Sequence, residues 1–237
     1  MEKDKEVGAV ILTGAPRLDG RPCFSAGVDI KEMQEIGASY HQMYLGTLEE
    51  CLFKTLWATA ESRDQWQFMP NRVQQFTKPI IAAIDGVCVA GGLELAMACD
   101  MRMVSEMAEI RDLHMKNLGK LGAGGLQTWL PRLVGIGKAK EIIWTGDPID
   151  GKEAVRIGFA QRVFPSEKLM EETKKIAKNI AANPPHALKL SKMVINASLS
   201  QGIYESLRFS DFSEALSRFL EAEEQAELRK KFVERGR

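Results

Sequence analysis

The stretch DGVCVAGGLELAMACD, residues 85–100, places two adjacent glycines and one carboxylate at the start of an apolar helix. The first N–H groups of a helix have no partner inside the helix and carry partial positive charge. Gly91 would expose such an N–H, which can hold an oxygen on which negative charge develops. Glu94 follows on the same helix face, flanked by apolar residues that argue against an ordinary solvated glutamate. The pattern predicts an oxyanion donor and an acid or base. Taken alone, a glycine pair between a strand and a helix more often marks only a sharp turn or close backbone packing.

A second junction of the same kind lies in CFSAGVDIKEM, residues 23–33. Small residues, Ser25, Ala26 and Gly27, again precede a helix, with Asp29 near its start. By itself this pattern also fits a capped helix that follows a loop. Two junctions, each after a strand, suggest two N–H donors directed at one oxygen, an arrangement that would stabilise an oxyanion or enolate.

Composition limits the classes of function that the chain can have. Its 237 residues fit one domain or one domain with an appendage, and 45% are hydrophobic, enough for a sizeable core. Lys plus Arg and Asp plus Glu number 32 each, without a long basic run, which argues against nucleic acid as a partner. No apolar segment reaches the length of a membrane span, and the charged start MEKDKEVGAV has no signal-peptide pattern. We expect a cytoplasmic protein with reduced thiols, because the four cysteines lack metal-like or disulfide-framework spacing. With three scattered histidines, no metal site is expected.

Alternating strand and helix patterns predict an α/β core followed by a helical C-terminal region. Strands are expected at 7–14, 78–86, 101–104 and 160–165, and a loop at 17–29. Helices are expected from residue 30 towards 66, and at 92–98, within 122–135, at 138–146 and at 150–158. Gly146 is the expected C-terminal cap of one helix, and Asp150 with Glu153 forms the capping-box pattern of the next. From residue 166 onward the chain is almost all helical, interrupted at NPP.

Five stretches, in this order, resemble the enoyl-CoA hydratase/isomerase family, also called the crotonase family. They are FSAGVDIKEM, KPIIAAIDGVCVAGGLELAMACD, GAGGLQTWLPRLVG, TGDPIDGKEAVRIGFAQRVFP and NPPHALKLSK, and the resemblance covers most of residues 7–218. It implies an α/β fold, a stacked, right-handed spiral of ββα repeats with a C-terminal helical trimerisation lobe. We therefore expect an acyl-CoA-binding catalytic core at residues 1–165 and a helical oligomerisation lobe at residues 166–237.

The resemblance also implies a substrate and the groups that hold it. Family members bind acyl-CoA thioesters, polarise the thioester carbonyl with two backbone N–H groups and stabilise an enolate-like species. Carried over to this sequence, the donors are Val28 and Gly91, and the coenzyme A moiety lies along Ser25, Ala26, Asp29, Ile30 and Lys31. In the hydratases the glutamate that matches Glu94 holds and activates water. Coenzyme A is then part of the substrate, and no separate cofactor is expected.

His114 is the main departure from the hydratase pattern. Hydratases of this family usually carry a second glutamate on the loop before the third Gly-rich turn. Counting back from GAGG at Gly122, that position holds His114. A histidine can orient water or relay a proton near neutral pH; the alternative is a buried histidine satisfied by the backbone or by Asp112. Isomerases of the family more often keep the second carboxylate and lose the first, so the retention of Glu94 favours water chemistry.

Two further departures concern the start of the chain and a long insertion. The β-hairpin and helix with which family members usually begin, and which help to bind the adenine end, are apparently missing. A truncated start and a weaker grip on coenzyme A are both open. The segment between Asp29 and Lys78 is longer than in compact hydratases and carries Phe53, Trp57, Trp66 and Phe68. These aromatics fit a helical hairpin packed on the core, or a wall of the acyl pocket that limits substrate size.

These features predict an enoyl-CoA hydratase-like lyase of fatty acid metabolism that adds water reversibly to an α,β-unsaturated acyl-CoA. Glu94 and His114 would handle water, and the N–H groups of Val28 and Gly91 would hold the enolate. A homotrimer or a dimer of trimers (homohexamer) is expected, with no membrane partner. The alternatives are a hydrolase or isomerase of the same fold, or a catalytically weak CoA-binding or scaffold subunit. The retained Glu94 and both N–H loops argue against the scaffold.

Overall fold

The computed structural model describes residues 4–15, 17–27, 68–122 and 124–220, together with 226, 228, 230 and 232–234, the side chains of 68–71 excepted. Contacts divide the chain into two compact units. The larger comprises residues 11–76 and 80–177, and the smaller comprises residues 1–10, 77–79 and 178–237. The boundary expected after residue 165 between a catalytic core and an oligomerisation lobe stays a prediction.

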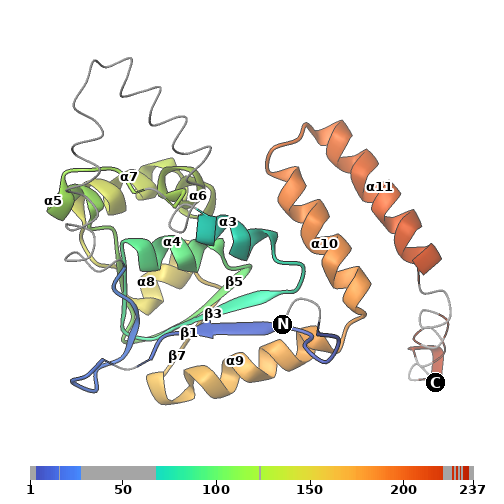
Figure 1. Ribbon diagram of the computed structural model, residues 1–237, viewed down its shortest axis with the longest axis horizontal. Helices are drawn as coiled ribbons and strands as arrows, with labels where there is room; N and C mark the ends of the chain where they lie inside the picture. The colour runs from blue at the N-terminus through green and yellow to red at the C-terminus, as the bar shows by residue number, and fades with distance from the viewer. Residues whose placement is uncertain are drawn as a thin grey trace. The chain divides into compact units, whose positions relative to one another are not determined.

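Two β-sheets take alternate strands of the chain. One sheet has the order β1 (Val10–Thr13), β3 (Ile80–Ile84), β5 (Met101–Ser105) and β7 (Arg162–Phe164). The other has the order β2 (Cys23–Ser25), β4 (Val87–Val89) and β6 (Glu109–Arg111). The pairs β3–β5, β5–β7, β2–β4 and β4–β6 are parallel. The strand pairs β3–β4 and β5–β6 each add one strand to each sheet before the chain enters a helix, which is the expected spiral of ββα repeats (Figure 1).

The core of the larger unit forms around β3, whose five residues are all buried. A strand buried on both faces carries a continuous apolar run, as IIAAI does. Leu93, Met103, Ile110, Leu126 and Leu130 are fully buried as well. These side chains come from both sheets and from the helices that follow them. Their packing holds the helix that carries Glu94 against the sheets.

The helices of the larger unit are α3 (Phe68–Gln75), α4 (Gly91–Ala98), α5 (His114–Leu118), α6 (Leu126–Val134), α7 (Ile136–Thr145) and α8 (Gly151–Arg156). The long α9 (Ser166–Ala181) follows β7, and α4 and α9 lie on opposite sides of β1 and β3 (Figure 1). Two helix signals in the sequence are confirmed. Gly146 caps α7 in the left-handed region, with φ 63°, and the Asp150 side chain accepts a hydrogen bond from the Glu153 N–H at 2.7 Å.

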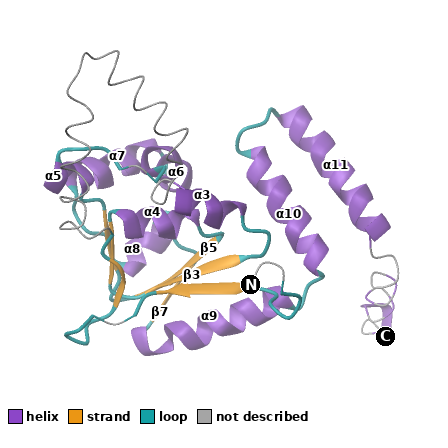
Figure 2. Ribbon diagram, viewed as in Figure 1, coloured by secondary structure: helices purple, strands orange, loops and turns teal. Residues whose placement is uncertain are grey.

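The smaller unit contains α10 (Pro185–Ser198) and α11 (Ile203–Leu220), which pack against each other as a helical pair (Figure 2). The expected interruption at NPP is confirmed, because α9 ends at Ala181 and α10 begins at Pro185. None of the helices in the described part of the chain is long and apolar enough to span a membrane.

Three expectations about elements were incomplete or wrong. The segment 17–29, expected to be a loop, contains β2, and β4 and β6 were not expected either. These strands have three residues each, too few to show an alternating pattern, and their pairing with neighbouring strands defines them. His114, expected on a loop, is the first residue of α5. The helix expected from residue 30 towards 66, with Phe53, Trp57 and Trp66, lies outside the described residues, as does the side chain of Phe68.

Candidate active site

The N-terminus of α4 is preceded by a strained residue. Ala90, the N-cap, has φ 50° and ψ −119°, and it is the one non-glycine residue with positive φ in the described part of the chain. Such a conformation costs about 1–3 kcal/mol in a side-chain-bearing residue and persists where its surroundings hold it. Here the Ala90 N–H donates to the Arg111 carbonyl at 3.4 Å, and the Ala90 carbonyl accepts from the Glu94 N–H at 3.1 Å. The strained turn therefore joins β4 to α4 and sets the direction of the Gly91 N–H.

The described part of the second predicted junction, residues 25–27, meets the first junction at this point. A Cβ placed on Gly27, whose φ is +88°, would lie 3.1 Å from the backbone nitrogen of Gly91. A Cβ on Gly92 would collide with the Ser25 carbonyl oxygen, so only glycine lets α4 approach β2 this closely. Gly91 and Gly27 are thus neighbours. This is the arrangement required if the N–H groups of Gly91 and of the residue after Gly27 are to bind one oxygen. Val28, Asp29, Ile30 and Lys31 lie outside the described residues.

The far end of α4 is fixed by a buried arginine. Arg102, on β5, is 3% exposed and donates to the Ala96 carbonyl at 3.3 Å and to the Cys99 carbonyl at 2.8 Å. The last carbonyls of a helix have no partners within it and carry partial negative charge, so a cation there is favourable. Burial lowers the pKa of Arg102, while the nearby Cys99 and Asp100 act in the opposite direction. This contact holds α4, and with it Glu94, against the sheet.

The carboxylate of Glu94 is enclosed by the backbone of the GAGG turn. Glu94 is 6% exposed, and its Oε1 accepts a hydrogen bond from the Gly124 N–H at 2.8 Å. A Cβ on Gly124 would lie 2.8 Å from Glu94 Oε2, so a side chain there would displace the carboxylate. Burial raises the pKa of Glu94; the Gly124 N–H and the nearby His114 oppose this, and Asp112 adds to it. Glu94 is thus a carboxyl group shifted towards the range useful for proton transfer.

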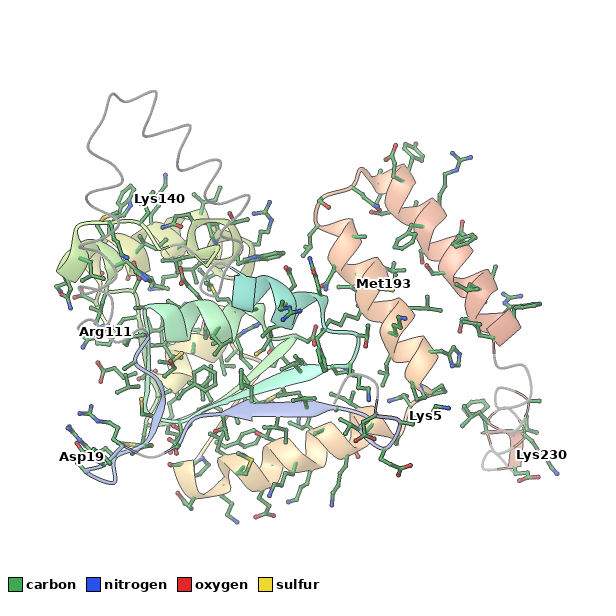
Figure 3. The ribbon with its side chains drawn as sticks, viewed as in Figure 1. Lys5, Asp19, Arg111, Lys140, Met193 and Lys230 are labelled. Atoms are coloured by element: carbon green, nitrogen blue, oxygen red, sulfur yellow. The ribbon has the colours of Figure 1, made fainter. Side chains whose placement is uncertain are left out.

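His114 lies beside Glu94 and is paired with Asp112. The His114 Nδ1 lies 2.7 Å from Asp112 Oδ1, and the backbone N–H of His114 donates to the same oxygen at 3.2 Å. The histidine is 8% exposed and the aspartate 1% exposed. Figure 3 labels Arg111, which ends β6 immediately before this pair. The partner proposed from the sequence for a buried His114 is therefore present, and His114 also lies near a second titratable group.

Gly122 is the point at which Glu94 and His114 converge. A Cβ at this position would lie 2.6 Å from Glu94 Oε1 and 3.1 Å from His114 Nδ1. The two side chains come from α4 and α5, and Gly122, in the segment before α6, lies close to both. In the sequence, Gly122 and its neighbours served only to locate His114 by spacing, and no role was predicted for Gly122 or Gly124. The cluster of glycines after a polar helix was the available signal.

The described residues contain no group of three or more His, Cys, Asp or Glu side chains that could bind a metal ion. That the reaction needs no metal ion stays a prediction. The geometry instead offers a buried carboxyl group, a histidine paired with an aspartate, and the N-terminus of α4. This set can hold a water molecule, move a proton and stabilise an oxyanion.

The raised pKa of Glu94 predicts a pH-dependent stability difference between the protein and its Glu94→Gln variant. The folded state holds the Glu94 proton more tightly than the unfolded chain, whose ordinary pKa is 4.5. Its contribution to stability is therefore complete below that value and is lost as the pH rises through the folded pKa. Glutamine does not titrate, so the Tm of the variant relative to that of the wild type should rise by a few degrees from about pH 4 to pH 8. Thermal unfolding across this range measures it, and a pH-independent difference would contradict the burial argument.

Comparison with known proteins gives a consistent picture over the whole chain. The sequence model of the family described as enoyl-CoA hydratase/isomerase matches residues 1–237. The short-chain-enoyl-CoA hydratase of Clostridium acetobutylicum is 37% identical over 235 residues, 99% of this chain and 80% of the relative. The crotonyl-CoA hydratase of Syntrophomonas wolfei is 34% identical over 200 residues, 84% of this chain and 68% of the relative.

Solved structures agree. The crystal structure of enoyl-CoA hydratase from Bacillus anthracis has 29% sequence identity and a TM-score of 0.79, over 99% of this chain and 81% of that one. The match is to the spiral fold that carries Gly91, Glu94 and the GAGG turn. Sequence and structure therefore agree that the chain belongs to the enoyl-CoA hydratase/isomerase family.

Proposed function

We propose that the protein is an enoyl-CoA hydratase, a lyase that adds water reversibly across the α,β double bond of an acyl-CoA thioester. The family assignment supports an acyl-CoA substrate, and relatives at 37% and 34% identity carry the names short-chain-enoyl-CoA hydratase and crotonyl-CoA hydratase. Short linear enoyl-CoA esters are therefore the first substrates to test. A place in cytoplasmic fatty acid metabolism is part of the proposal, as is the absence of any cofactor besides the coenzyme A of the substrate.

One observation carries the proposal. The buried carboxylate of Glu94 lies one helical turn from the Gly91 N–H and converges with His114 on Gly122. Water held by Glu94 with help from His114 would be next to an acyl group whose carbonyl oxygen is held at the N-terminus of α4. Holding the reacting atoms together in this way is among the largest contributions that an active site makes.

The chemistry balances with these groups alone. One O–H bond of water breaks and its oxygen bonds to the β-carbon, while the double-bond electrons move to make the thioester an enolate. Glu94, with help from His114, accepts the proton of that water. The enolate oxygen is held by the N–H groups of Gly91 and Val28. The proton that Glu94 accepted is then delivered to the α-carbon, which restores the thioester carbonyl and returns Glu94 to its starting form; the reverse sequence removes water.

Several parts of the proposal rest on the resemblance alone. Val28 as second donor, and Asp29, Ile30 and Lys31 as contacts of coenzyme A, lie outside the described residues. Ser25 is described and packs its backbone against Gly92, and Ala26 beside it is exposed. Binding of a non-reactive acyl-CoA, measured by calorimetry, tests this set. A scaffold that is catalytically weak would bind such a ligand without reducing the absorbance of an enoyl thioester.

Gly122→Ala is expected to lower hydration about tenfold to a hundredfold without unfolding the protein. The new methyl group would lie 2.6 Å from Glu94 Oε1. Because that atom ends a flexible side chain, the carboxylate moves at small cost in stability but leaves its reactive position. Steady-state kinetics and thermal unfolding of the variant measure both effects.

Gly137→Ala is the matched control, because a Cβ on Gly137 of α7 meets nothing within 4 Å. It should leave turnover unchanged. A Gly122→Ala variant as active as this control would show that Glu94 does not need its observed position.

We also propose that the protein is a homotrimer or a dimer of trimers, formed through its C-terminal helices. Met193, labelled in Figure 3, and Phe212 are 45% and 66% exposed in the single chain, and Ile203 and Phe219 are 69% and 85% exposed. Exposed large apolar side chains on neighbouring helices are typical of an interface. Light scattering at micromolar concentration should give three or six times the mass of the chain, and Phe212→Glu should shift it downward. A stable wild-type monomer would contradict the proposal.

A further inference from the structure

Asp112 is among the most buried acidic residues in the described part of the chain, and it lies outside the set of groups assigned to the reaction. It is 1% exposed and follows β6 directly, two residues before His114. Burial of a carboxylate costs several kcal/mol unless its oxygens are hydrogen-bonded or paired. The contacts of Asp112 therefore decide whether it serves the fold or the chemistry.

Among the described residues, both donors that reach Asp112 come from His114, and both reach the same oxygen. Oδ1 accepts from the backbone N–H at 3.2 Å and lies 2.7 Å from the ring Nδ1. An ionised carboxylate can only accept hydrogen bonds. The ring must therefore carry a hydrogen on Nδ1, and in the neutral imidazole this makes Nε2 the acceptor. Asp112 thus selects one of the two tautomers of His114.

The other oxygen of Asp112 is poorly compensated. Oδ2 is buried and has no hydrogen-bond partner among the described residues. A buried acceptor without a partner destabilises the fold, and such atoms in native proteins call for a functional explanation. A neutral side chain could hold the turn between β6 and α5 at lower cost. The negative charge of Asp112 is therefore better explained by its effect on neighbouring groups than by a structural need.

Two further charged groups come from neighbouring segments. Glu94, on α4, interacts electrostatically with His114 and Asp112, and Lys120, in the turn after α5, interacts with Glu94. When His114 accepts a proton on Nε2, the ring becomes a cation directly bonded to the Asp112 carboxylate. An anionic partner stabilises that cation, while a neutral partner does not.

We propose that Asp112 is a positioning residue for the hydration reaction: it engages the Nδ1 of His114, the ring nitrogen that approaches Gly122, and leaves Nε2 as the nitrogen that can accept a hydrogen bond from the reacting water. This inference rests on the proposed function for its catalytic part, whereas the tautomer can be tested without any substrate. Asp112 acts through His114 and contacts neither water nor the acyl group. It gives the histidine the accepting role that a second carboxylate would have.

The tautomer is measured first, on the wild-type protein labelled with ¹⁵N-histidine. The sequence has only three histidines, His41, His114 and His186, so assignment needs one variant of each. We expect the nitrogen shifts of His114 at neutral pH to report a protonated Nδ1 and an unprotonated Nε2. In Asp112→Asn this preference should weaken or reverse, since an amide can donate to Nδ1 as well as accept from it. The opposite tautomer in the wild type would overturn the inference.

Kinetics then test the consequence for the reaction. Asp112→Asn should reduce kcat at least about tenfold with little change in KM, because the acyl-CoA contacts are untouched. In a His114→Ala background the same substitution should have no further effect, since Asp112 acts only through the ring. A merely structural aspartate would lower activity equally in both backgrounds, and that result would overturn the inference. Asp112→Ala, with the same dependence on His114 expected, covers the case in which the asparagine variant does not fold.

Asp147→Asn is the matched control. Asp147 lies near α5, where it pairs with Lys116 at 3.7 Å, but its side chain is 74% exposed. Loss of one exposed negative charge close to the same helix should leave both the tautomer and kcat unchanged. A comparable loss in this variant would assign the effect to general charge and overturn the role of Asp112. A wild-type protein with the expected tautomer and no hydratase activity would overturn the proposed function and the catalytic part of the inference, but not the tautomer assignment.

Discussion

Glu94→Gln is expected to lower hydration of an enoyl-CoA by about a hundredfold to ten-thousandfold while acyl-CoA binding survives. Glutamine keeps the size of the side chain. Its amide oxygen can still accept the hydrogen bond that the Gly124 N–H donates to Glu94 Oε1 at 2.8 Å in the wild type. It cannot accept the proton of water. The loss should therefore appear in kcat, with KM nearly unchanged. Turnover of a short enoyl-CoA and calorimetry with a saturated acyl-CoA measure the two quantities.

The control for this variant is Glu141→Gln, an exposed glutamate of α7 that pairs with Lys138 at 2.9 Å. It should retain full activity, because exposed ion pairs contribute little. A fully active Glu94→Gln protein would remove Glu94 from the mechanism and leave His114 and Asp112 as the groups to consider.

The same variant, combined with His114→Ala, tests whether the two side chains share the proton. If His114 and Glu94 hold one water molecule, the second substitution should cost far less in the presence of the first. This double-mutant cycle on turnover is expected to be strongly non-additive. Strictly additive losses would make His114 a structural neighbour, in spite of its convergence with Glu94 on Gly122.

Gly91→Val is expected to reduce kcat by about a hundredfold or more, the usual effect of losing one oxyanion donor. Space beside the Gly91 nitrogen is small, since a Cβ on Gly27 would already lie 3.1 Å from it. A branched side chain on α4 at this position would occupy the place of the thioester oxygen. Measurement of kcat on a good substrate, together with a circular dichroism spectrum, separates a blocked hole from an unfolded protein.

Gly137→Val, on α7, introduces the same side chain where a Cβ meets nothing within 4 Å, and should keep its activity. Full turnover by the Gly91→Val variant would mean that the enolate oxygen is held elsewhere.

Features predicted correctly from the sequence were those that a short local pattern determines. β3 was visible because a strand buried on both faces has a continuous apolar run, and α8 because Asp150 and Glu153 have capping spacing. β2, β4 and β6 were missed, since three residues carry no periodicity and pair only when the spiral brings them together.

In the candidate site, too, the local relations could be predicted from the sequence and the long-range contacts could not. Gly91 and Glu94 could be placed together because they are one turn apart on a helix, whatever the rest of the fold. The hydrogen bond from Gly124 to Glu94 spans 30 residues, and no local pattern contains it. The approach of His114 to Glu94 likewise depends on β6 and α5, neither of which the sequence indicated. Their shared neighbour, Gly122, became apparent only from the space that a side chain would need there.

Identification of the reaction products is the decisive measurement of whether this protein adds water to an enoyl thioester. A short linear 2-enoyl-CoA is incubated with the wild-type protein and with Glu94→Gln, and products are identified by mass spectrometry alongside an assay for free thiol. We expect the enoyl absorbance to fall with the wild type, the product to have gained one water molecule and still to carry coenzyme A, and the variant to form almost none of it. Release of free coenzyme A would indicate thioester hydrolysis, and an isomeric product of unchanged mass would indicate isomerisation. Either result without the hydrated thioester would show that the protein is not a hydratase.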